Sequence, residues 1–295
     1  LAWNAPNPES DDFSLRRYAT STGLAHVLGF VKYPSTDTSG FYYQTEFVGK
    51  AGVEQAYDDE LTGENGLKIT EITAVGEVAS ESVIERPEDG ANLRLTIDAE
   101  LQHQLFETIK LTAAEQNYRG GSGVIIDIHT GEIISLTSFP EYEEQVLTDG
   151  EDEKEIGSYA NNAATPFVNR AVSGLYTPGS IVKPFLAAAA LEEEVIAPET
   201  EINSSGELVI PNPYFPDKPT VFGDWKAHGR TDMREAIAVS SNVYFYGIGG
   251  GLPEGTANIE LDGLGIDRIE RYMRAFGFGE PTGIALENEK GGTIP

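Results

Sequence analysis

The sequence predicts an α+β fold, in which a β-rich N-terminal region of about 90 residues precedes a larger domain of helices and strands. Three observations predict it. Residues 1–90 cluster apolar and β-branched residues between glycine and proline turns. Residues 93–139 carry, in order, a strand pattern, a long helical pattern and a hairpin pattern. Beyond residue 174 helical patterns predominate, so we expect a sheet that lacks most of its strands.

The composition limits the function classes. The 295 residues include 48 acidic and 20 basic side chains, which gives a formal net charge of −28 at pH 7. Such a surface repels nucleic acid and anionic lipid, so we expect no nucleic-acid partner. There is no cysteine, which excludes disulfides, thiolate metal sites and a cysteine nucleophile. No stretch approaches the roughly 18 apolar residues of a membrane span, and the first residues lack a signal-peptide pattern.

The N-terminal region is expected to be mostly strands. Residues 23–34 and 41–54 are apolar clusters bounded by glycine and proline, which favours strands. Residues 53–63 predict a short helix that Gly63 ends. The polar turn cluster ERPEDGAN, residues 85–92, indicates a boundary. We therefore predict a pedestal region over 1–90 and a second domain over 91–295.

The second domain begins with recognisable elements. Residues 93–98 predict a strand, and 99–117 predict a helix with apolar residues at helical spacing and Asp98 as its cap. Residues 121–139 hold two β-branched runs around the turn HTGE, which predicts a hairpin. The acidic run 143–157 is typical of a solvated loop.

The remaining residues predict helices around one long irregular stretch. Residues 197–230 are rich in proline, glycine and asparagine and predict no regular element. A helix is predicted to follow with Thr231 or Asp232 as its cap, and another over 265–279 that ends at glycines.

The phrase TPGSIVKP, residues 177–184, places a serine and a lysine three residues apart. A serine hydroxyl needs a base and a site for the oxyanion before it can act as a nucleophile. Residues i and i+3 share a face of a helix, so Lys183 can reach the Ser180 hydroxyl. Burial would lower the lysine pKa and let it act as that base. The alternative is the start of an ordinary helix, because such a short motif is weak by itself.

A second polar motif, Ser240-Ser241-Asn242, follows about sixty residues later. Its hydroxyls can relay a proton, and the asparagine amide can hold both a lysine and a substrate carbonyl. The alternative is a polar turn after a helix. The two motifs in this order and at this spacing are much rarer than either alone.

The two motifs resemble those of the serine acyl-transferases that bind penicillin. Further phrases resemble class B penicillin-binding proteins in the same order along nearly the whole chain, most closely the elongation type and next the division type: VGKAGVEQAYDDELTGENG, LRLTIDAELQ, GVIIDIHTGEIISLTSFP, NRAVSGLYTPGSIVKP, FGDWKAHGRTDMREAIAVSSNVYFY and FGFGEPTGIAL. The resemblance implies a transpeptidase domain of the penicillin-binding-protein and serine β-lactamase type, behind a β-rich pedestal.

The resemblance also implies an activity, that of a peptidoglycan D,D-transpeptidase in cell-wall elongation and cell shape. Ser180 would attack the D-Ala–D-Ala carbonyl of a stem peptide, with Lys183 as base, Ser240 as proton shuttle and Asn242 holding the substrate amide. Ser241 and Trp225 are expected to contribute to substrate binding. β-Lactams would acylate Ser180. A glycosyltransferase and cell-wall scaffold proteins are implied as partners, on the outer face of a bacterial membrane, with no cofactor.

One family feature is missing. The third motif, Lys-Thr-Gly or a variant, should follow the second, but the sequence holds none there. His129-Thr130-Gly131 precedes the serine and fills the predicted hairpin turn, so we expect a structural role for it. Because the chain starts at Leu1 and stops at Pro295 in a loop-like phrase, we interpret both ends as cut, and we expect this piece alone not to turn over substrate.

Other readings stay open. Asp224, His228 and Asp232 lie near the second motif, but one local histidine and no cysteine make a poor zinc site, so we predict no metal. A β-lactam sensor or β-lactamase would share both motifs, although the first 90 residues argue against these classes. A non-catalytic scaffold that docks on a glycosyltransferase is compatible with the transpeptidase.

Overall fold

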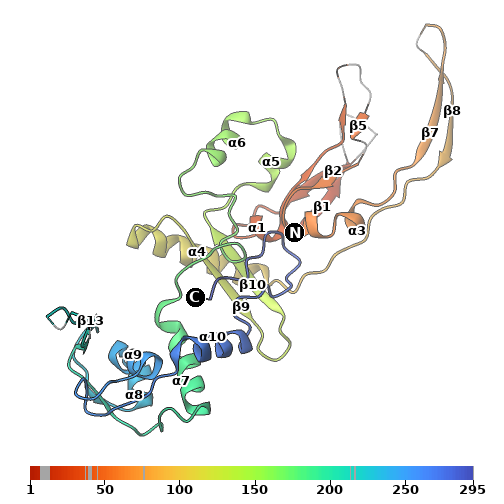
Figure 1. Cartoon of the computed structure of the whole chain (residues 1–295). Coiled ribbons are helices and arrows are strands. Elements are labelled where there is room, and N and C mark those ends of the chain that lie inside the picture. The colour runs from red at the N-terminus through yellow and green to blue at the C-terminus, as the bar shows by residue number, and fades with distance from the viewer. Residues whose placement is uncertain are drawn as a thin grey trace. The chain divides into compact units, whose positions relative to one another are not determined.

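The computed structural model describes residues 1–6, 14–36, 38, 42–44, 46–75, 77–212, 214–215 and 217–294. The chain divides into two compact units (Figure 1). Unit 1 is Leu1–Gly174 with Gly283–Lys290, and unit 2 is Leu175–Thr282 with Gly291–Pro295. Among the described residues, no helix is both long enough and apolar enough to span a membrane. The predicted boundary near residue 90 stays a prediction.

The N-terminal part of unit 1 consists of short antiparallel pairs. β1 (Ala2–Ala5) pairs with β2 (Leu15–Tyr18), β3 (Val31–Lys32) with β6 (Val48–Gly49), and β4 (Ser35–Thr36) with β5 (Tyr42–Gln44). The helices α2 (Gly52–Ala56) and α3 (Asp58–Thr62) follow and confirm the predicted helix, which Gly63 ends as expected.

The expected strand over 23–34 is wrong in its first half. Residues Ala25–Leu28 form the short helix α1, and only Val31–Lys32 is a strand. All four residues of α1 are buried. A helix that is buried on every side shows no alternation of apolar and polar residues, so the sequence shows no sign of helical periodicity here. Within the predicted strand over 41–54, residues 42–44 and 48–49 form β5 and β6, but the prediction is wrong for residues 52–54, which begin α2. Residues 41 and 45 lie outside the described part.

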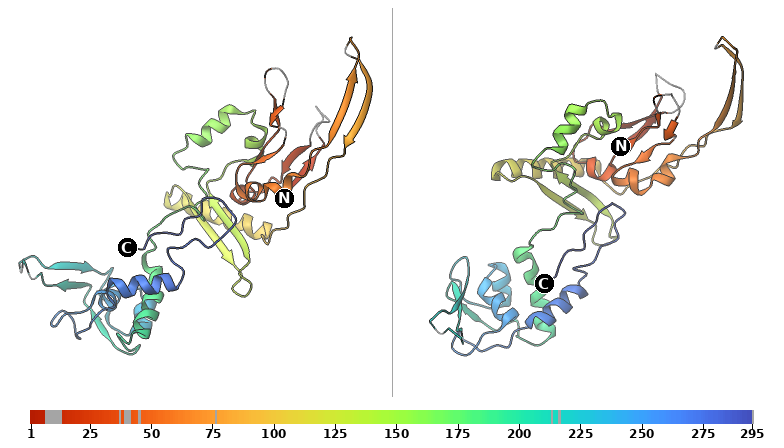
Figure 2. Two further views of the ribbon diagram at one scale, coloured as in Figure 1. Left: turned by 45° about the vertical axis from the view of Figure 1, so that its right-hand side comes forward. Right: turned by 45° about the horizontal axis from the view of Figure 1, so that its top comes forward.

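The hairpin of β7 (Leu67–Ile72) and β8 (Val78–Glu85) is the most exposed part of unit 1. Every described residue of both strands is exposed. In both views of Figure 2 it extends away from the other strands of this unit. The pairing is antiparallel, with register shifts near both ends of β7.

The long helix and the hairpin of unit 1 are confirmed. α4 (Ala99–Gln116) begins at Asp98, whose carboxylate accepts hydrogen bonds from Glu100 N and Leu101 N at 3.0 and 2.9 Å. β9 (Gly121–Ile126) pairs with β10 (Ile133–Phe139). The predicted strand over 93–98 is wrong, because its backbone makes one bond to β10, from Asp98 N to Ile134 O, and forms no ladder.

The acidic run 143–157, which we predicted as a loop, forms two helices. These are α5 (Glu144–Asp149) and α6 (Glu153–Ala160). The acidic residues stand at helix starts, where free N–H groups favour negative charge: Asp152 caps α6 through Glu155 N. Leu147 is buried and attaches α5 to the core.

Unit 2 is mainly helical. A 3₁₀ turn, η1 (Gly179–Val182), leads into α7 (Lys183–Glu192), and α8 (Met233–Ala238), α9 (Asn242–Gly250) and α10 (Gly265–Ala275) follow. Asp232 caps α8 in a full capping box, which confirms one of the two predicted caps. Apolar residues of α7, α8 and α9 form its buried core, with Tyr244 and Ile248 fully enclosed.

The stretch 197–230 is more regular than predicted. β11 (Ile202–Ser204) pairs with β14 (Gly229–Thr231), and between them β12 (Glu207–Ile210) pairs with β13 (Thr220–Gly223). Each strand has only three or four residues, too short to give a readable alternation. The two nested pairs bring residue 204 beside residue 229 and so fold this stretch back toward α9.

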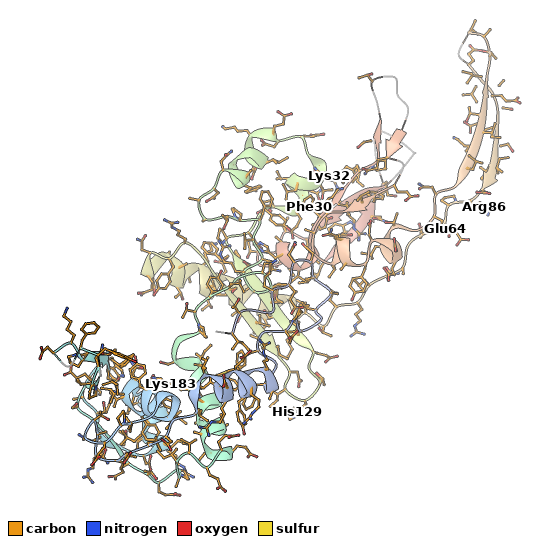
Figure 3. The ribbon with its side chains drawn as sticks, viewed as in Figure 1. Phe30, Lys32, Glu64, Arg86, His129 and Lys183 are labelled. Carbon is orange, nitrogen blue, oxygen red and sulfur yellow. The ribbon has the colours of Figure 1, made fainter. Side chains whose placement is uncertain are left out.

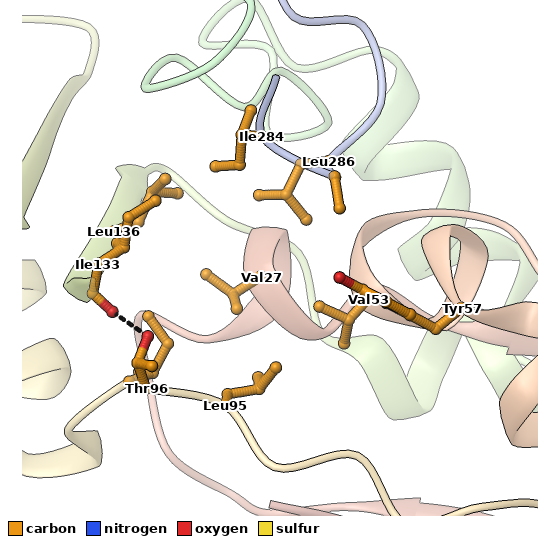
Figure 4. A pocket seen from close by; sticks show the side chains of 11 residues that line it. Val27, Val53, Tyr57, Leu95, Thr96, Ile133, Leu136, Ile284 and Leu286 are labelled. Atoms are coloured by element: carbon orange, nitrogen blue, oxygen red, sulfur yellow. Dashed lines mark hydrogen bonds between the residues drawn. The ribbon is translucent and has the colours of Figure 1, made fainter. Parts of the chain in front are cut away.

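An apolar cavity of about 250 Å³ lies in the core of unit 1 (Figure 4). It is lined by α1, α2, the 95–97 segment, β10 and the returning segment 284–286. The Thr96 hydroxyl donates to Ile133 O at 2.6 Å at its edge. This cavity contains neither predicted motif, so it is not the candidate active site.

Candidate active site

Ser180 lies on the 3₁₀ turn before α7. Gly179 precedes it with φ +63°, a conformation that side chains with a Cβ rarely adopt. Lys183 N donates to Ser180 O and closes the turn, and Pro184 follows within the first turn of α7. The Ser180 side chain is exposed, and its hydroxyl makes no hydrogen bond to any residue that the structure describes. The serine is therefore open to an incoming reactant.

Lys183 is buried, with 7 % of its surface exposed. Its Nζ donates to Asn242 Oδ1 at 2.7 Å, to Ser240 O at 2.8 Å and to Ser240 Oγ at 3.1 Å. It also lies 5.5 Å from the centre of the Phe245 ring. Burial lowers the pKa of Lys183, and the Asp224 carboxylate partly opposes this by raising it. Figure 3 shows Lys183 on α7.

The two predicted motifs therefore meet through Lys183. As an ammonium, the lysine uses all three of its protons on the second motif. Helical spacing predicts the lysine amine at Ser180, one turn back, whereas in this conformation the amine bonds to Ser240 and Asn242. The structure brings three of the four predicted catalytic residues into direct contact, and Ser180 lies on the 3₁₀ turn that leads into the helix of Lys183.

The second motif is a tight connection between α8 and α9. Ser240 has φ +55°, an uncommon conformation for a serine, which presents both its carbonyl and its hydroxyl to Lys183. Ser241 is fully buried and caps α9. Asn242 is the first residue of α9. Neighbouring residues thus serve different purposes, because Ser240 and Asn242 face the lysine while Ser241 faces inward.

Ser241, predicted to bind substrate, instead bonds to a buried carboxylate. Its hydroxyl donates to Asp224 Oδ2 at 3.0 Å, and Val243 N donates to the same oxygen at 3.0 Å. Burial acts to raise the pKa of Asp224, but hydrogen bonds from backbone N–H groups and from Ser241 outweigh it and lower the pKa to about 2. Asp224 is thus a negative charge behind the second motif.

Sequence reasoning missed this role of Asp224 and considered the residue only as a metal ligand. No spacing rule joins residue 224 to residue 241, because the contact depends on the nested strand pairs. His228 Nε2 lies 3.5 Å from Asp224 Oδ1, too far for a good hydrogen bond, and Asp232 is occupied as the cap of α8. Among the described residues, no group of three or more potential metal ligands forms.

Trp225 lies beside the site. It is 62 % exposed, and its indole N–H donates to Val239 O at 3.1 Å. Phe222 and Tyr246 contact each other nearby, and Tyr246 Oη and Asn242 Nδ2 both lie 3.5 Å from Gly223 O. The indole ring of Trp225 is therefore exposed and held in place by its N–H group, and its expected contribution to substrate binding stays a prediction.

Two residues outside the site make structural contacts, and for His129 this is the role that the sequence predicts. His129 stands in the turn between β9 and β10 (Figure 3), where its backbone N–H donates to Asp127 Oδ1 at 2.7 Å. Arg170 braces the 164–168 loop through bonds to Ala164 O, Thr165 O and Val168 O.

Comparison with known proteins identifies two family models. Residues 121–295 match the penicillin binding protein transpeptidase domain, and residues 6–95 match the penicillin-binding protein dimerisation domain. The chain is similar to the peptidoglycan D,D-transpeptidase MrdA of Haemophilus influenzae, at 33 % identity over 98 % of this chain and 42 % of the relative. It is 32 % identical to MrdA of Escherichia coli K12, over 98 % of this chain and 44 % of the relative.

Solved structures of penicillin-binding proteins are also similar to this chain. The complex between penicillin-binding protein PBP2 and MreC from Helicobacter pylori superposes with a TM-score of 0.73 at 30 % identity, over 96 % of this chain and 50 % of that one. Pseudomonas aeruginosa PBP2 in complex with WCK 5153 gives 0.69 at 28 % identity, over 95 % and 54 %. The chain thus spans less than half the length of both curated relatives. The predicted similarity to the elongation type is confirmed. With a transpeptidase model matched over more than half its length, the chain belongs to the penicillin-binding protein transpeptidase family.

Proposed function

We propose that this chain forms the acylation half of a peptidoglycan D,D-transpeptidase of the elongation type, which cross-links stem peptides in cell-wall growth and cell shape. One observation carries the proposal. A buried lysine, three residues after an exposed serine, is held by three hydrogen bonds to the second motif. An ordinary helix start would leave such a lysine in solvent, because burying a charge is costly without partners. The similarity to two D,D-transpeptidases supports the same activity.

In the proposed acylation, Ser180 Oγ attacks the carbonyl of the D-Ala–D-Ala peptide bond. Its proton passes to Lys183, which must first be neutral in order to accept it. A neutral amine has two N–H groups and one lone pair. It can keep its bonds to Ser240 O and Asn242 Oδ1, while the lone pair accepts a proton from Ser180 or from Ser240 Oγ. Ser240 can then pass a proton toward the departing D-Ala amine.

The electrostatics of Lys183 suit this role. Burial lowers its pKa from 10.5, so more of the amine is neutral at the pH of growth than in an exposed lysine. The ester formed on Ser180 is then resolved by an amine of a second stem peptide, which forms the cross-link. β-Lactams would take the place of D-Ala–D-Ala and leave a stable ester on Ser180.

The partners follow from the relatives. One solved relative is a PBP2 in complex with MreC, and another belongs to a peptidoglycan synthase complex studied for the coordination of polymerization and crosslinking. We propose that this protein likewise acts with a cell-wall scaffold protein and a glycosyltransferase, on the outer face of the membrane. The exposed β7–β8 hairpin is a surface available for such contacts in unit 1.

Labelling with benzylpenicillin tests the proposal. The purified chain is incubated with the drug, its intact mass is measured, and the modified peptide is mapped. We expect a single adduct on Ser180 and none in Ser180→Ala. Ser205→Ala is the matched control, because Ser205 is another exposed serine of unit 2 that contacts only Glu207 O. An adduct that survives Ser180→Ala, or a folded wild-type chain that takes no adduct, would refute the assignment.

A further inference from the structure

Asp224 is the most deeply buried charge near the two motifs. Its side chain is 0 % exposed, and it lies in the connection between β13 and β14. Oδ2 accepts hydrogen bonds from Ser241 Oγ, Val243 N and Ser204 Oγ at 3.0, 3.0 and 3.2 Å. Oδ1 accepts one from Trp225 N at 2.9 Å. Four donors on one carboxylate compensate for its removal from water.

These donors come from separate elements. Ser204 ends β11, and Ser241 and Val243 stand on either side of Asn242 at the start of α9. The carboxylate therefore fixes the backbone around Asn242 against the strand pairs. Without it, the hydroxyls of Ser204 and Ser241 would lose a buried acceptor. The position of Asn242 Oδ1 at Lys183 depends on that anchoring.

The charge of Asp224 also acts on the lysine. Burial lowers the pKa of Lys183, and Asp224 is the charged group that raises it. His228, from the same connection, faces Asp224 from 3.5 Å with a side chain only 2 % exposed. On α8, which packs against both α7 and α9, Arg234 and Glu235 are exposed. Within the described residues, Asp224 is therefore the charge that most directly opposes the effect of burial on the lysine.

We propose that Asp224 is a positioning residue of the serine–lysine site, which holds the second motif against Lys183 and supplies the buried negative charge that the lysine faces. Asp224 makes no hydrogen bond to Ser180 or Lys183. It acts through its hydrogen bonds to Ser241 and Val243 and through the electrostatic effect of its charge on Lys183. The catalytic importance of Asp224 rests on the proposed function, whereas its hydrogen bonds do not depend on that proposal.

The test is the titration of Lys183 itself, which requires no activity. The chain is labelled with ¹³C,¹⁵N-lysine, the Lys183 signal is assigned by its loss in Lys183→Arg, and its side-chain shifts are followed with pH. In Asp224→Asn we expect the pKa of Lys183 to fall, because an opposite charge is removed. A structural role alone would leave this titration unchanged.

Two control variants separate charge from packing. Glu207→Gln changes the net charge equally at an exposed site of unit 2, and Ser204→Ala removes one hydrogen bond but keeps the Asp224 charge. Both should titrate as the wild type does. An Asp224→Asn titration equal to wild type, or an equal shift in Glu207→Gln, overturns the proposal.

Acylation by benzylpenicillin provides a second readout. In Asp224→Asn the acidic limb of the rate against pH should move to lower pH by the same amount as the lysine titration. If that variant does not fold, Asp224→Glu replaces it, since the longer carboxylate keeps the charge but cannot meet all four donors. Lys183 should then titrate as in wild type while acylation slows at least about tenfold, and an unchanged rate overturns the proposal. A wild-type chain without an adduct refutes the proposed function instead, and the lysine titration remains readable.

Discussion

Gln102 is a fully buried amide that joins α4 to β10 and to the turn before α1, and its removal should destabilise unit 1 strongly. Its Nε2 donates to Gly23 O and Leu136 O, and its Oε1 accepts from Ser135 Oγ and Leu136 N, both at 2.8 Å. Gln102→Met keeps the size of the side chain but removes all four bonds. Gly23 O retains the Thr137 hydroxyl, while both backbone groups of Leu136 and the buried hydroxyl of Ser135 lose their Gln102 partner.

The magnitude follows from those three buried groups. Each buried group without a partner costs about 1–3 kcal/mol, so with about 2 kcal/mol for each backbone group and about 1 kcal/mol for the hydroxyl the free energy of unfolding should fall by about 5 kcal/mol. Urea unfolding followed by circular dichroism measures it. Gln104→Met on the same helix is the control, because Gln104 is exposed and bonds only to Glu100, and it should change stability by less than about 0.5 kcal/mol. Equal effects of the two variants would refute this account of the core.

Three further changes can be measured by the same unfolding assay. Burial raises the pKa of Glu144 from 4.5 to about 8, so the contribution of this residue to stability is complete below pH 4.5 and is lost as the pH rises toward 8. The free energy of unfolding of Glu144→Gln, relative to that of the wild type, should therefore rise by about 3 kcal/mol between pH 5 and pH 8. A difference between the two proteins that does not change with pH would contradict this. Glu54→Ala leaves the guanidinium of Arg16 without its partner at 2.7 Å and should cost about 3 kcal/mol, whereas a loss below about 1 kcal/mol would show that solvent replaces the pair. Gly179→Ala places a Cβ on a residue with positive φ and should lower the free energy of unfolding by about 1 kcal/mol. Benzylpenicillin should also acylate Ser180 more slowly in this variant, and an unchanged rate would show that the conformation of the turn does not affect the site.

Local patterns predicted the elements that depend on local physics. The cap at Asp98, the 18-residue helix after it and the hairpin around His129 were all predicted, because capping, helical period and turn chemistry lie within a few residues of one another. The acidic helices α5 and α6 were missed, since their charge pattern is that of a loop and buried contacts such as that of Leu147 hold α5 in place.

The candidate site was predictable only in part. The spacing of Ser180 and Lys183 indicated a shared helix turn, and Ser240 and Asn242 followed from the second motif. What could not be predicted is where the lysine amine points, because its partners are nearly sixty residues away in sequence. The role of Asp224 was hidden for the same reason, since it arises from the pairing of strands too short to leave a pattern.

The coupling between Ser180 and Lys183 is central to the proposed chemistry. The most direct measurement is the rate of Ser180 acylation by benzylpenicillin in wild type, in Lys183→Met and in Lys218→Met, an exposed lysine of the same unit. A positioned base contributes about 10²- to 10⁴-fold, so Lys183→Met should acylate at least about a hundredfold more slowly while Lys218→Met keeps the wild-type rate. Equal rates in all three folded proteins would contradict the claim that this buried lysine activates the serine.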